Sequence, residues 1–430
     1  MISLVGASGR PVFLRTRYPA HIVLTAKPAA RAGVGSQLHL RFLVEKFSFV
    51  NGHGAILPMS TIFFYVSGHG YGHASRQVEI IRALRAKRGD IRLFVRTSAP
   101  SWLFERGLGD LVELSHVEVD TGVVQIDSLK VDVAASTAQA SAFHEQLEAR
   151  SESEARLLTA CRADLVVADI PPLAFSAAAR AGLPAAAAAN FTWDWIYGAY
   201  QSEVARTPNL VPRIQRAYAT AAVAWRLPMH GGFESFSRIV DVPHVARRSS
   251  RDPRDVRKIL NLPTTQPLVL ISFGRYGLSE IDWSTVATIT DYGIVLTHNG
   301  NQYTAVDGVR LGAGSPFRLV DEGTLRRSGL SYEDLVRAMD AVITKPGYGI
   351  IAECAANDTA VLYTSRGRFI EYDILVEAMP RYVRCGYIPQ DALFRGDWKP
   401  PLDALLAAPR PAAADFSGAA VIADGILELL

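Results

Sequence analysis

Two histidines lie in a glycine-rich segment, residues 67–76, which reads SGHGYGHASR. The segment follows an apolar run typical of a buried strand and precedes a pattern typical of an amphipathic helix. Glycines at such a turn let backbone N–H groups point towards a ligand, and a helix start favours negative charge. Histidine forms turns poorly but is a good general base near neutral pH, so we predict that His73, or alternatively His69, acts in catalysis. The other members of this loop are Gly68, Gly70 and Gly72.

Asp169 ends another apolar run, residues 164–169. Because ligands of open parallel sheets bind beyond the carboxyl ends of the strands, we expect its side chain to project into the same cleft. Asp169 could act as a base, or it could cap the helix that follows. The next apolar run ends in the sequence NFTWDW, which includes Trp193 and Asp194. Its tryptophans could stack on a sugar, or they could cover the core, which is the commoner use of aromatic residues.

A possible diphosphate cradle lies in the second half of the chain. Gly274 and Arg275 follow an apolar run at residues 268–273. A guanidinium offers two parallel hydrogen bonds to a phosphate, and a glycine lets the backbone approach it closely. We therefore expect this turn to contact phosphate groups.

A third glycine-rich turn, KPGYGIIAE, covers residues 345–353 and again has the order strand, turn, helix. Lys345 opens the turn, which contains Gly347 and Gly349. Glu353 lies about one helical turn further on. A carboxylate there could accept hydrogen bonds from a ribose diol or could stabilise the start of the helix, and the pattern leaves both interpretations open.

These turns are embedded in two series of alternating strands and helices. Strand-like runs without polar alternation are typical of parallel strands that are covered on both faces. The first series has strands at 62–66, 91–95, 164–169 and 184–190, and helices at 75–87, 137–160 and 173–181. The second has strands at 268–273, 291–298, 341–344 and 360–365, and helices at 331–339 and 349–356. We predict an α/β protein with two Rossmann-like, doubly wound parallel sheets that face each other across a cleft.

The predicted domains are an N-terminal one of residues 59–240 and a C-terminal one of residues 255–412. Residues 241–254 are rich in Arg, Ser and Pro, which suits an exposed linker. Residues 413–430 form a predicted C-terminal helix that could pack back across the cleft.

Residues 1–58 differ from the rest in composition. They contain seven Lys or Arg residues and one Glu, a net charge of +6, whereas the whole chain has +3. The segment resembles an organelle transit peptide, but Met59 could also be the true start, and we favour the second interpretation. In either case we expect little packed structure before Met59.

Composition excludes several classes of protein. The net charge of +3 gives no reason to expect nucleic acid as a partner, and no apolar run reaches the roughly 18 residues of a membrane span. Three scattered cysteines make a disulfide framework or a zinc site improbable and fit the cytoplasm. The glycine spacing matches neither a dinucleotide fingerprint nor a P-loop.

The turn at residues 345–353 resembles the donor-binding segment of GT-B glycosyltransferases, which include the enzymes that add N-acetylglucosamine to the peptidoglycan lipid precursor. The resemblance implies that Gly347 and Gly349 approach a diphosphate and that Glu353 holds the ribose. The first glycine-rich loop is similar to the Gly-Gly-His loop of these enzymes. His73 takes the place of the histidine, although Tyr71 interrupts the glycines.

Five separated segments also resemble, in the same order, the glycosyltransferase-like N-terminal domain of plant arabinokinases. They are residues 67–76, 120–128, 164–171, 190–197 and 241–248. The resemblance spans nearly all of residues 60–380. No phosphate loop of the sugar kinases is present in the sequence, so the resemblance does not imply kinase activity.

We therefore expect a glycosyltransferase of hexosyl or N-acetylhexosaminyl type. It would move a sugar from a nucleotide diphosphate sugar, with UDP as the expected nucleotide, to an acceptor hydroxyl, without a metal or other cofactor. His73 or Asp169 would take the hydroxyl proton, while Arg275 and Lys345 would hold the phosphates. The first glycine-rich loop, with Trp193 and Asp194, would face the acceptor. The alternatives are a nucleotide-sugar epimerase on the same fold and a non-catalytic module that binds nucleotide-sugars.

Overall fold

The computed structural model describes residues 59–274, 278, 280–298 and 317–430, together with the backbone of four short strands before residue 59. These strands belong to a compact unit, Met1–Met59, which is separate from the unit Ser60–Leu430. They form two antiparallel pairs, β1 (Ile2–Val5) with β2 (Pro11–Leu14) and β3 (Ser48–Val50) with β4 (Ile56–Pro58).

The first domain of the larger unit is built on a seven-stranded sheet whose neighbouring strands are all parallel. In sheet order the strands are β13 (Ile239–Asp241), β12 (Val223–Gly231), β11 (Ala185–Phe191), β10 (Leu165–Asp169), β5 (Thr61–Val66), β6 (Arg92–Thr97) and β7 (Glu113–His116). Strands β5, β10 and β11 are buried at every residue, which explains their uninterrupted apolar sequences.

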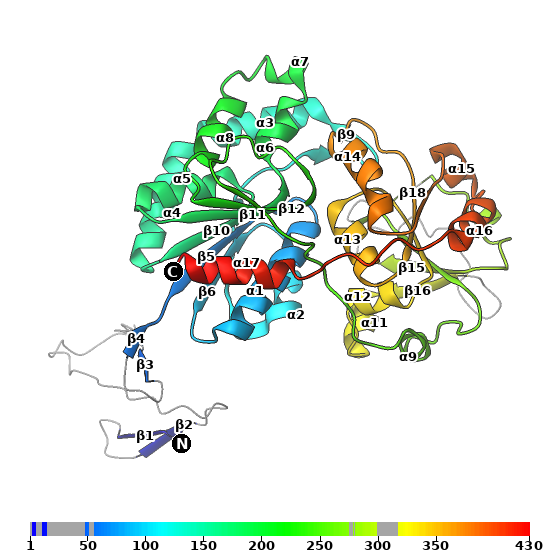
Figure 1. Ribbon diagram of the computed structural model, residues 1–430, viewed down its shortest axis with the longest axis horizontal. Coiled ribbons are helices and arrows are strands. Elements are labelled where there is room, and N and C mark those ends of the chain that lie inside the picture. Colours follow the sequence, from blue (N-terminus) through cyan, green and yellow to red (C-terminus); the bar gives the residue numbers. More distant parts are fainter. Residues whose placement is uncertain are drawn as a thin grey trace, which may run out of the picture. The chain divides into compact units, whose positions relative to one another are not determined.

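Helices cover both faces of this sheet (Figure 1). One face packs against α1 (Gly72–Lys87), α2 (Trp102–Leu108) and the C-terminal helix α17 (Gly418–Glu428). The other face packs mainly against α3 (Val133–Glu145), α4 (Leu147–Ala160), α5 (Pro172–Ala181), α6 (Trp193–Gly198) and α8 (Leu210–Tyr218). A short helix α7 (Gln201–Val204) and a hairpin of β8 (Val124–Gln125) and β9 (Val131–Asp132) complete the domain.

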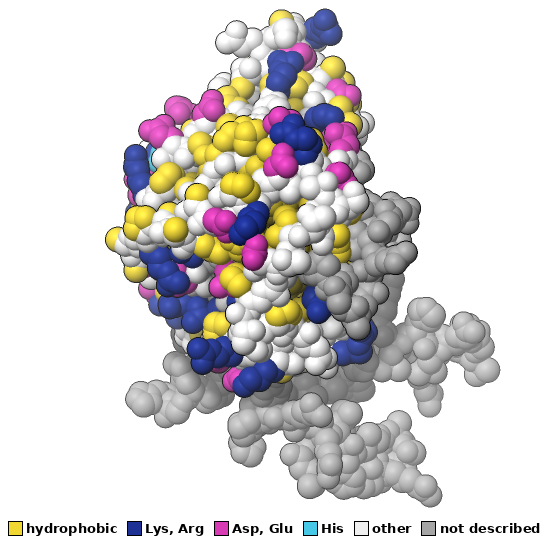
Figure 2. All heavy atoms as spheres, turned by 90° about the vertical axis from the view of Figure 1, so that its right-hand side faces the viewer, with side chains coloured by type: hydrophobic (Ala, Val, Ile, Leu, Met, Phe, Trp, Pro, Cys, Tyr) yellow, Lys and Arg dark blue, Asp and Glu magenta, His cyan; other side chains and the backbone are white. Residues whose placement is uncertain are grey.

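The second domain is built on a six-stranded parallel sheet. Its strands, in sheet order, are β16 (Phe317–Asp321), β15 (Gly293–His298), β14 (Leu268–Ser272), β17 (Ala341–Thr344), β18 (Ala360–Tyr363) and β19 (Cys385–Tyr387). Its helices are α9 (Pro253–Ile259), α10 (Trp283–Val286), α11 (Glu322–Arg327), α12 (Tyr332–Arg337), α13 (Tyr348–Ala356), α14 (Glu371–Ala378), α15 (Gln390–Arg395) and α16 (Lys399–Ala407). On the face of this domain in Figure 2, basic and acidic side chains are interspersed with apolar ones. The predicted fold class, two doubly wound parallel sheets, is confirmed.

The single helix predicted over residues 137–160 is in fact two helices, α3 and α4, which meet at Gln146. The interruption lets Phe143 and Leu147, on either side of it, pack together against Leu173 of α5. Periodicity alone could not show this break, because neither glycine nor proline marks it.

The chain ends on the first domain, not on the second. Ile422, Ala423 and Ile426 of α17 belong to the apolar layer that covers the first sheet, and Lys87 of α1 forms an ion pair with Asp424. Among the described residues, no helix has both the length and the apolar character to cross a lipid bilayer.

Candidate active site

A cleft of about 600 Å³ lies where the carboxyl ends of both parallel sheets meet, and residues of both domains line it. The first domain contributes the loop after β5 and the start of α1. The second contributes the ends of β14, β15 and β17 and the start of α13. Gly72 and Gly349, in the first turns of α1 and α13, approach closely: a Cβ on Gly349 would lie 3.1 Å from the Gly72 Cα. Two helix N-termini therefore meet at one cavity, an arrangement that favours a negatively charged ligand.

His73 and Asp169 form a hydrogen-bonded pair on the first-domain side of the cleft. His73 Nδ1 lies 2.7 Å from Asp169 Oδ1, and both side chains are buried. Since a carboxylate only accepts, Nδ1 carries the proton, and Nε2 keeps the free electron pair that a base requires. Asp169 does not cap α5, whose N-cap is Pro171, so its carboxylate is committed to the histidine and to its other partners.

Arg76 binds both oxygens of the same carboxylate. Its Nε lies 2.8 Å from Asp169 Oδ2, and its Nη2 lies 2.9 Å from Oδ1. Gln77 Nε2 donates a further hydrogen bond to Oδ2, at 3.1 Å. Burial alone would raise the pKa of Asp169, but the charges of Arg76 and His73 outweigh it and lower this pKa to about 2. Asp169 therefore stays ionised, which favours His73 over Asp169 as the base. Arg76 ends the glycine-rich segment quoted above, but the sequence reasoning assigned it no role, since an arginine within a helix is ordinarily solvated.

His69 lies in the same loop but is held differently. Its ring contacts Trp193 edge-on, with 5.6 Å between the ring centroids, and it packs against Gly122. Burial, with the nearby charges of His73, Arg366 and Lys345, lowers the pKa of His69 to about 3. His69 is thus neutral over the physiological range and lines the cleft as a wall residue.

Trp193 and Asp194 do not line the cleft. The Trp193 indole is 1% exposed and donates from Nε1 to Asp120 Oδ2 at 2.9 Å. Asp194 is also buried and accepts a hydrogen bond from Ser235. Trp193 therefore packs in the core, which was one of the two interpretations of the sequence. Asp194 supports the loop that follows β12.

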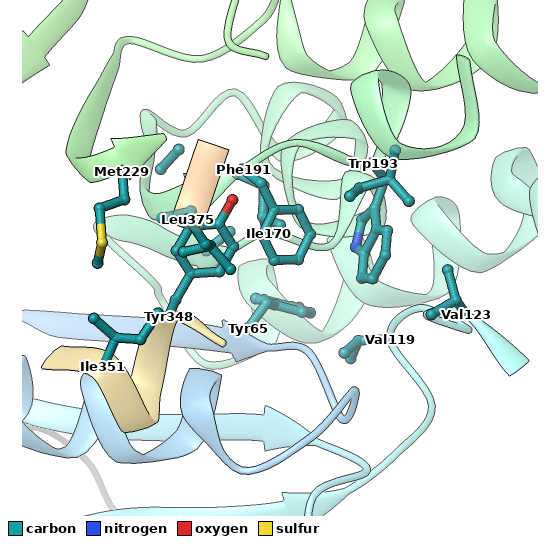
Figure 3. Close-up of a cluster of buried hydrophobic side chains, with 14 of the residues drawn as sticks. Tyr65, Val119, Val123, Ile170, Phe191, Trp193, Met229, Tyr348, Ile351 and Leu375 are labelled. Carbon is teal, nitrogen blue, oxygen red and sulfur yellow. The ribbon is translucent and has the colours of Figure 1, made fainter. Parts of the chain in front are cut away.

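An aromatic contact joins the two domains beside the histidine. Phe191, at the end of β11, meets the His73 ring edge-on, with 5.4 Å between centroids. Its other neighbour is Tyr348 of α13, stacked at 5.7 Å. Figure 3 shows the rings of Phe191 and Tyr348 side by side, with Ile170 and Trp193 nearby. Neither Phe191 nor Tyr348 was singled out from the sequence, because an isolated aromatic residue usually indicates core.

Two cations occupy the second-domain side of the cleft. Lys345 directly follows β17, and Arg366 follows β18; both line the cavity. Arg366 Nη1 lies 3.3 Å from the Pro346 carbonyl oxygen and 3.7 Å from Glu371. Burial, followed by the charge of Arg366, lowers the pKa of Lys345 to about 7. Two like charges held together at a helix N-terminus create a site for an anion, and Arg366 is a member that the sequence reasoning missed.

Glu353 lies on α13 and lines the same cavity, but its carboxylate already has a partner. Arg247 binds Glu353 Oε1 through its guanidinium, and its Nη1 also lies 3.5 Å from Glu333. Burial raises the pKa of Glu353, although Arg247 opposes that shift. Arg247 belongs to the segment that the sequence suggested was an exposed linker. Instead its side chain is largely covered and joins that segment to α13.

The glycines fall at the turns where they were expected. Gly70 and Gly274 have positive φ values, 78° and 72°, and both line the cleft. At Gly68 a Cβ would stand 2.0 Å from Ser98 Oγ, so a larger residue there would require Ser98 to shift. Arg275 lies outside the described residues. Within the described ranges, no group of three or more His, Cys, Asp or Glu side chains is placed to hold a metal ion.

Among curated proteins the chain is similar to one that is named as a kinase. The chain is 30% identical over 346 residues to L-arabinokinase of Arabidopsis thaliana, an alignment that covers 79% of this chain and 31% of that protein. The chain thus spans about a third of the length of this relative. No family model matches the sequence.

Solved structures with the same arrangement of domains are glycosyltransferases. The glycotransferase of kitacinnamycin superposes with a TM-score of 0.56 at 16% identity, covering 86% of this chain and 99% of that one. The calicheamicin glycosyltransferase CalG4 gives 0.55 at 17%, covering 87% and 99%. Phytolacca americana UGT2, solved with UDP-2-fluoroglucose and pterostilbene, gives 0.52 at 12%, covering 86% and 95%. At such identities the likeness establishes the fold.

Proposed function

We propose that this chain, which has the GT-B glycosyltransferase fold, transfers a glycosyl group from a nucleotide diphosphate sugar to the hydroxyl of an acceptor. The observation that carries the proposal is the position of the His73–Asp169 pair. It stands on one wall of the cleft, while Lys345, Arg366 and the N-terminus of α13 stand on the other.

In the proposed reaction, His73 Nε2 removes the proton from the acceptor hydroxyl as that oxygen attacks the anomeric carbon of the donor. The new bond is the one between the acceptor oxygen and the anomeric carbon. The bond from that carbon to the diphosphate breaks, and the nucleoside diphosphate leaves with the electron pair. Asp169 holds the imidazole in the tautomer that can accept the proton, a role it can perform because it stays ionised.

The donor would lie against the second domain. Backbone N–H groups at Gly347 and Gly349, together with Lys345 and Arg366, would offset the charge that develops on the leaving diphosphate. Glu353 would accept the ribose hydroxyls, with Arg247 fixing its carboxylate. We propose UDP as the nucleotide and a hexose or N-acetylhexosamine as the sugar. We also propose that no metal is required, since Lys345 and Arg366 would offset the charge of the diphosphate in its place.

A second candidate is a non-catalytic module that binds nucleotide-sugars. One observation favours it: the curated relative that the chain matches is named L-arabinokinase, for a different reaction, and the chain spans about a third of its length. Such a module would keep the donor side of the cleft and bind without turnover.

A panel of nucleotide-sugars distinguishes the two. Each is added to the full chain with a mixture of hydroxyl acceptors, and both the rise in melting temperature and the release of free nucleoside diphosphate are measured. We expect one donor to give both responses. His116→Ala, which changes an exposed histidine at the end of β7, serves as the control and should behave as the unchanged protein. Stabilisation without nucleotide release for every acceptor would favour the binding module.

A further inference from the structure

Arg76 makes the histidine pair into a group of three side chains. His73 and Arg76 lie three residues apart on α1 and so share one face of the helix. The Arg76 guanidinium holds both Asp169 oxygens, and its Nη2 is also 3.3 Å from His73 Nδ1. Nη1 binds the Asn190 side chain at the end of β11. The guanidinium is therefore fixed by Asp169 and Asn190, at contact distance from the imidazole.

This geometry changes the charge that the imidazole experiences. A lone carboxylate beside a histidine favours the imidazolium, because opposite charges attract. Here the carboxylate lies 2.7 Å and the guanidinium 3.3 Å from His73 Nδ1, so the repulsion from Arg76 opposes the attraction of Asp169. Among the described residues, His69 and Asp120 from the loops of the first domain also interact electrostatically with His73, and Tyr348 lies beyond Phe191.

We propose that Arg76 is a positioning residue that offsets the charge of Asp169 at His73 and so opposes protonation of the imidazole. The proposal deepens the proposed transferase function, because only a neutral imidazole can take the proton of an acceptor. Arg76 also keeps Asp169 ionised, so that the proton taken up by Nε2 leaves to solvent and Nδ1–H stays bound to the carboxylate.

The test follows the protonation of His73 directly and needs no substrate. The full chain is labelled with ¹⁵N-histidine, and the ring resonances are followed by NMR between about pH 4.5 and 8.5, with His73→Gln used for assignment. In Arg76→Gln we expect the titration midpoint of His73 to rise by about one unit or more, because the substitution removes a like charge that disfavours the imidazolium, and a charge at this distance shifts a titration by about 1–3 units. Arg76→Lys, which keeps the charge, should stay near the midpoint of the unchanged protein.

Arg82→Gln is the matched control, since Arg82 lies on the same helix but is exposed and pairs with Glu79. It should leave the His73 midpoint unchanged. An equal midpoint in the unchanged protein and in folded Arg76→Gln would overturn the proposal and reduce Arg76 to a structural counter-ion of Asp169.

Arg76→Gln leaves a buried carboxylate with fewer partners, so a second pair of variants guards against misfolding. In Asp169→Asn the repulsion from Arg76 acts alone, and the midpoint should fall below that of the unchanged protein. Adding Arg76→Gln to Asp169→Asn should raise it again, and an unchanged midpoint would contradict the proposal. Because this measurement involves no donor, a failure to release nucleotide would count against the transferase function alone.

Discussion

Gly72 of the first domain and Gly349 of the second are in contact across the cleft, because neither carries a side chain. A Cβ on Gly349 would stand 3.1 Å from the Gly72 Cα, closer than ordinary van der Waals contact. Each glycine lies in the first turn of a helix, α1 or α13. The contact therefore brings together the helix that carries His73 and the helix that begins at the proposed diphosphate site.

This contact predicts that Gly349→Ala separates the two helices or strains them. We expect a loss of about 1–3 kcal/mol in the free energy of unfolding, the usual cost of overpacking, measured by chemical denaturation. Gly198→Ala, at a site where a Cβ would meet nothing within 4 Å, is the control for introducing an alanine. Full stability of Gly349→Ala would show that the helices tolerate a wider separation.

Glu353→Gln tests the ribose assignment. Hydrogen bonds to charged groups contribute about 1.5–3 kcal/mol, so we expect the affinity for a nucleoside diphosphate, measured by calorimetry, to fall roughly ten- to hundredfold. Glu377→Gln changes an exposed glutamate of α14 and should have no effect. Unchanged affinity in folded Glu353→Gln would leave Glu353 only as the counter-ion of Arg247.

The lowered pKa of Lys345 implies that the affinity for the donor depends on pH. Its pKa in the free protein is about 7, so part of the population is uncharged at neutral pH. A bound diphosphate favours the ammonium and raises this pKa, so binding is strongest below pH 7 and weakens as the pH rises through the pKa of the bound state. The loss reaches at most about tenfold per pH unit for a single proton.

The measurement is calorimetry of a nucleotide-sugar near pH 8 in buffers of different ionisation enthalpy. We expect uptake of up to one proton on binding, and Lys345→Met should abolish the uptake while weakening the binding. Binding without proton uptake would mean that Lys345 does not contact the diphosphate.

Truncation tests the role of residues 1–58, which remains a prediction. A chain that begins at Met59 should match the melting temperature of the full chain within error, because Met1–Met59 forms its own compact unit. A decrease of several degrees would show that the segment stabilises the rest of the protein.

Sequence reasoning found the sheets because buried parallel strands such as β10 and β11 leave uninterrupted apolar runs. The GT-B fold that the glycine-rich turns suggested is confirmed, since solved glycosyltransferases superpose on the chain. His73 and Asp169 were both selected because they stand where strands end. The sequence could not show that the two side chains form a hydrogen bond, because they are 96 positions apart.

The charged partners of the site could not be found in this way. Arg76 resembles any solvated helix residue, and its contacts with Asp169 and Asn190 span about a hundred positions. Arg366 lies in a loop with no motif. Arg247 was placed in an exposed linker on composition alone, whereas its position depends on where the second domain folds against it.

The central claim is that His73 is the base of a transfer reaction, and His73→Ala tests it most directly. With the donor identified by the nucleotide-sugar panel, turnover and donor affinity are measured on the unchanged protein, His73→Ala, Asp169→Asn and the exposed control His116→Ala. We predict that His73→Ala keeps its donor affinity while turnover falls about a hundred- to ten-thousandfold, with a smaller fall for Asp169→Asn. Full turnover in His73→Ala would contradict the account.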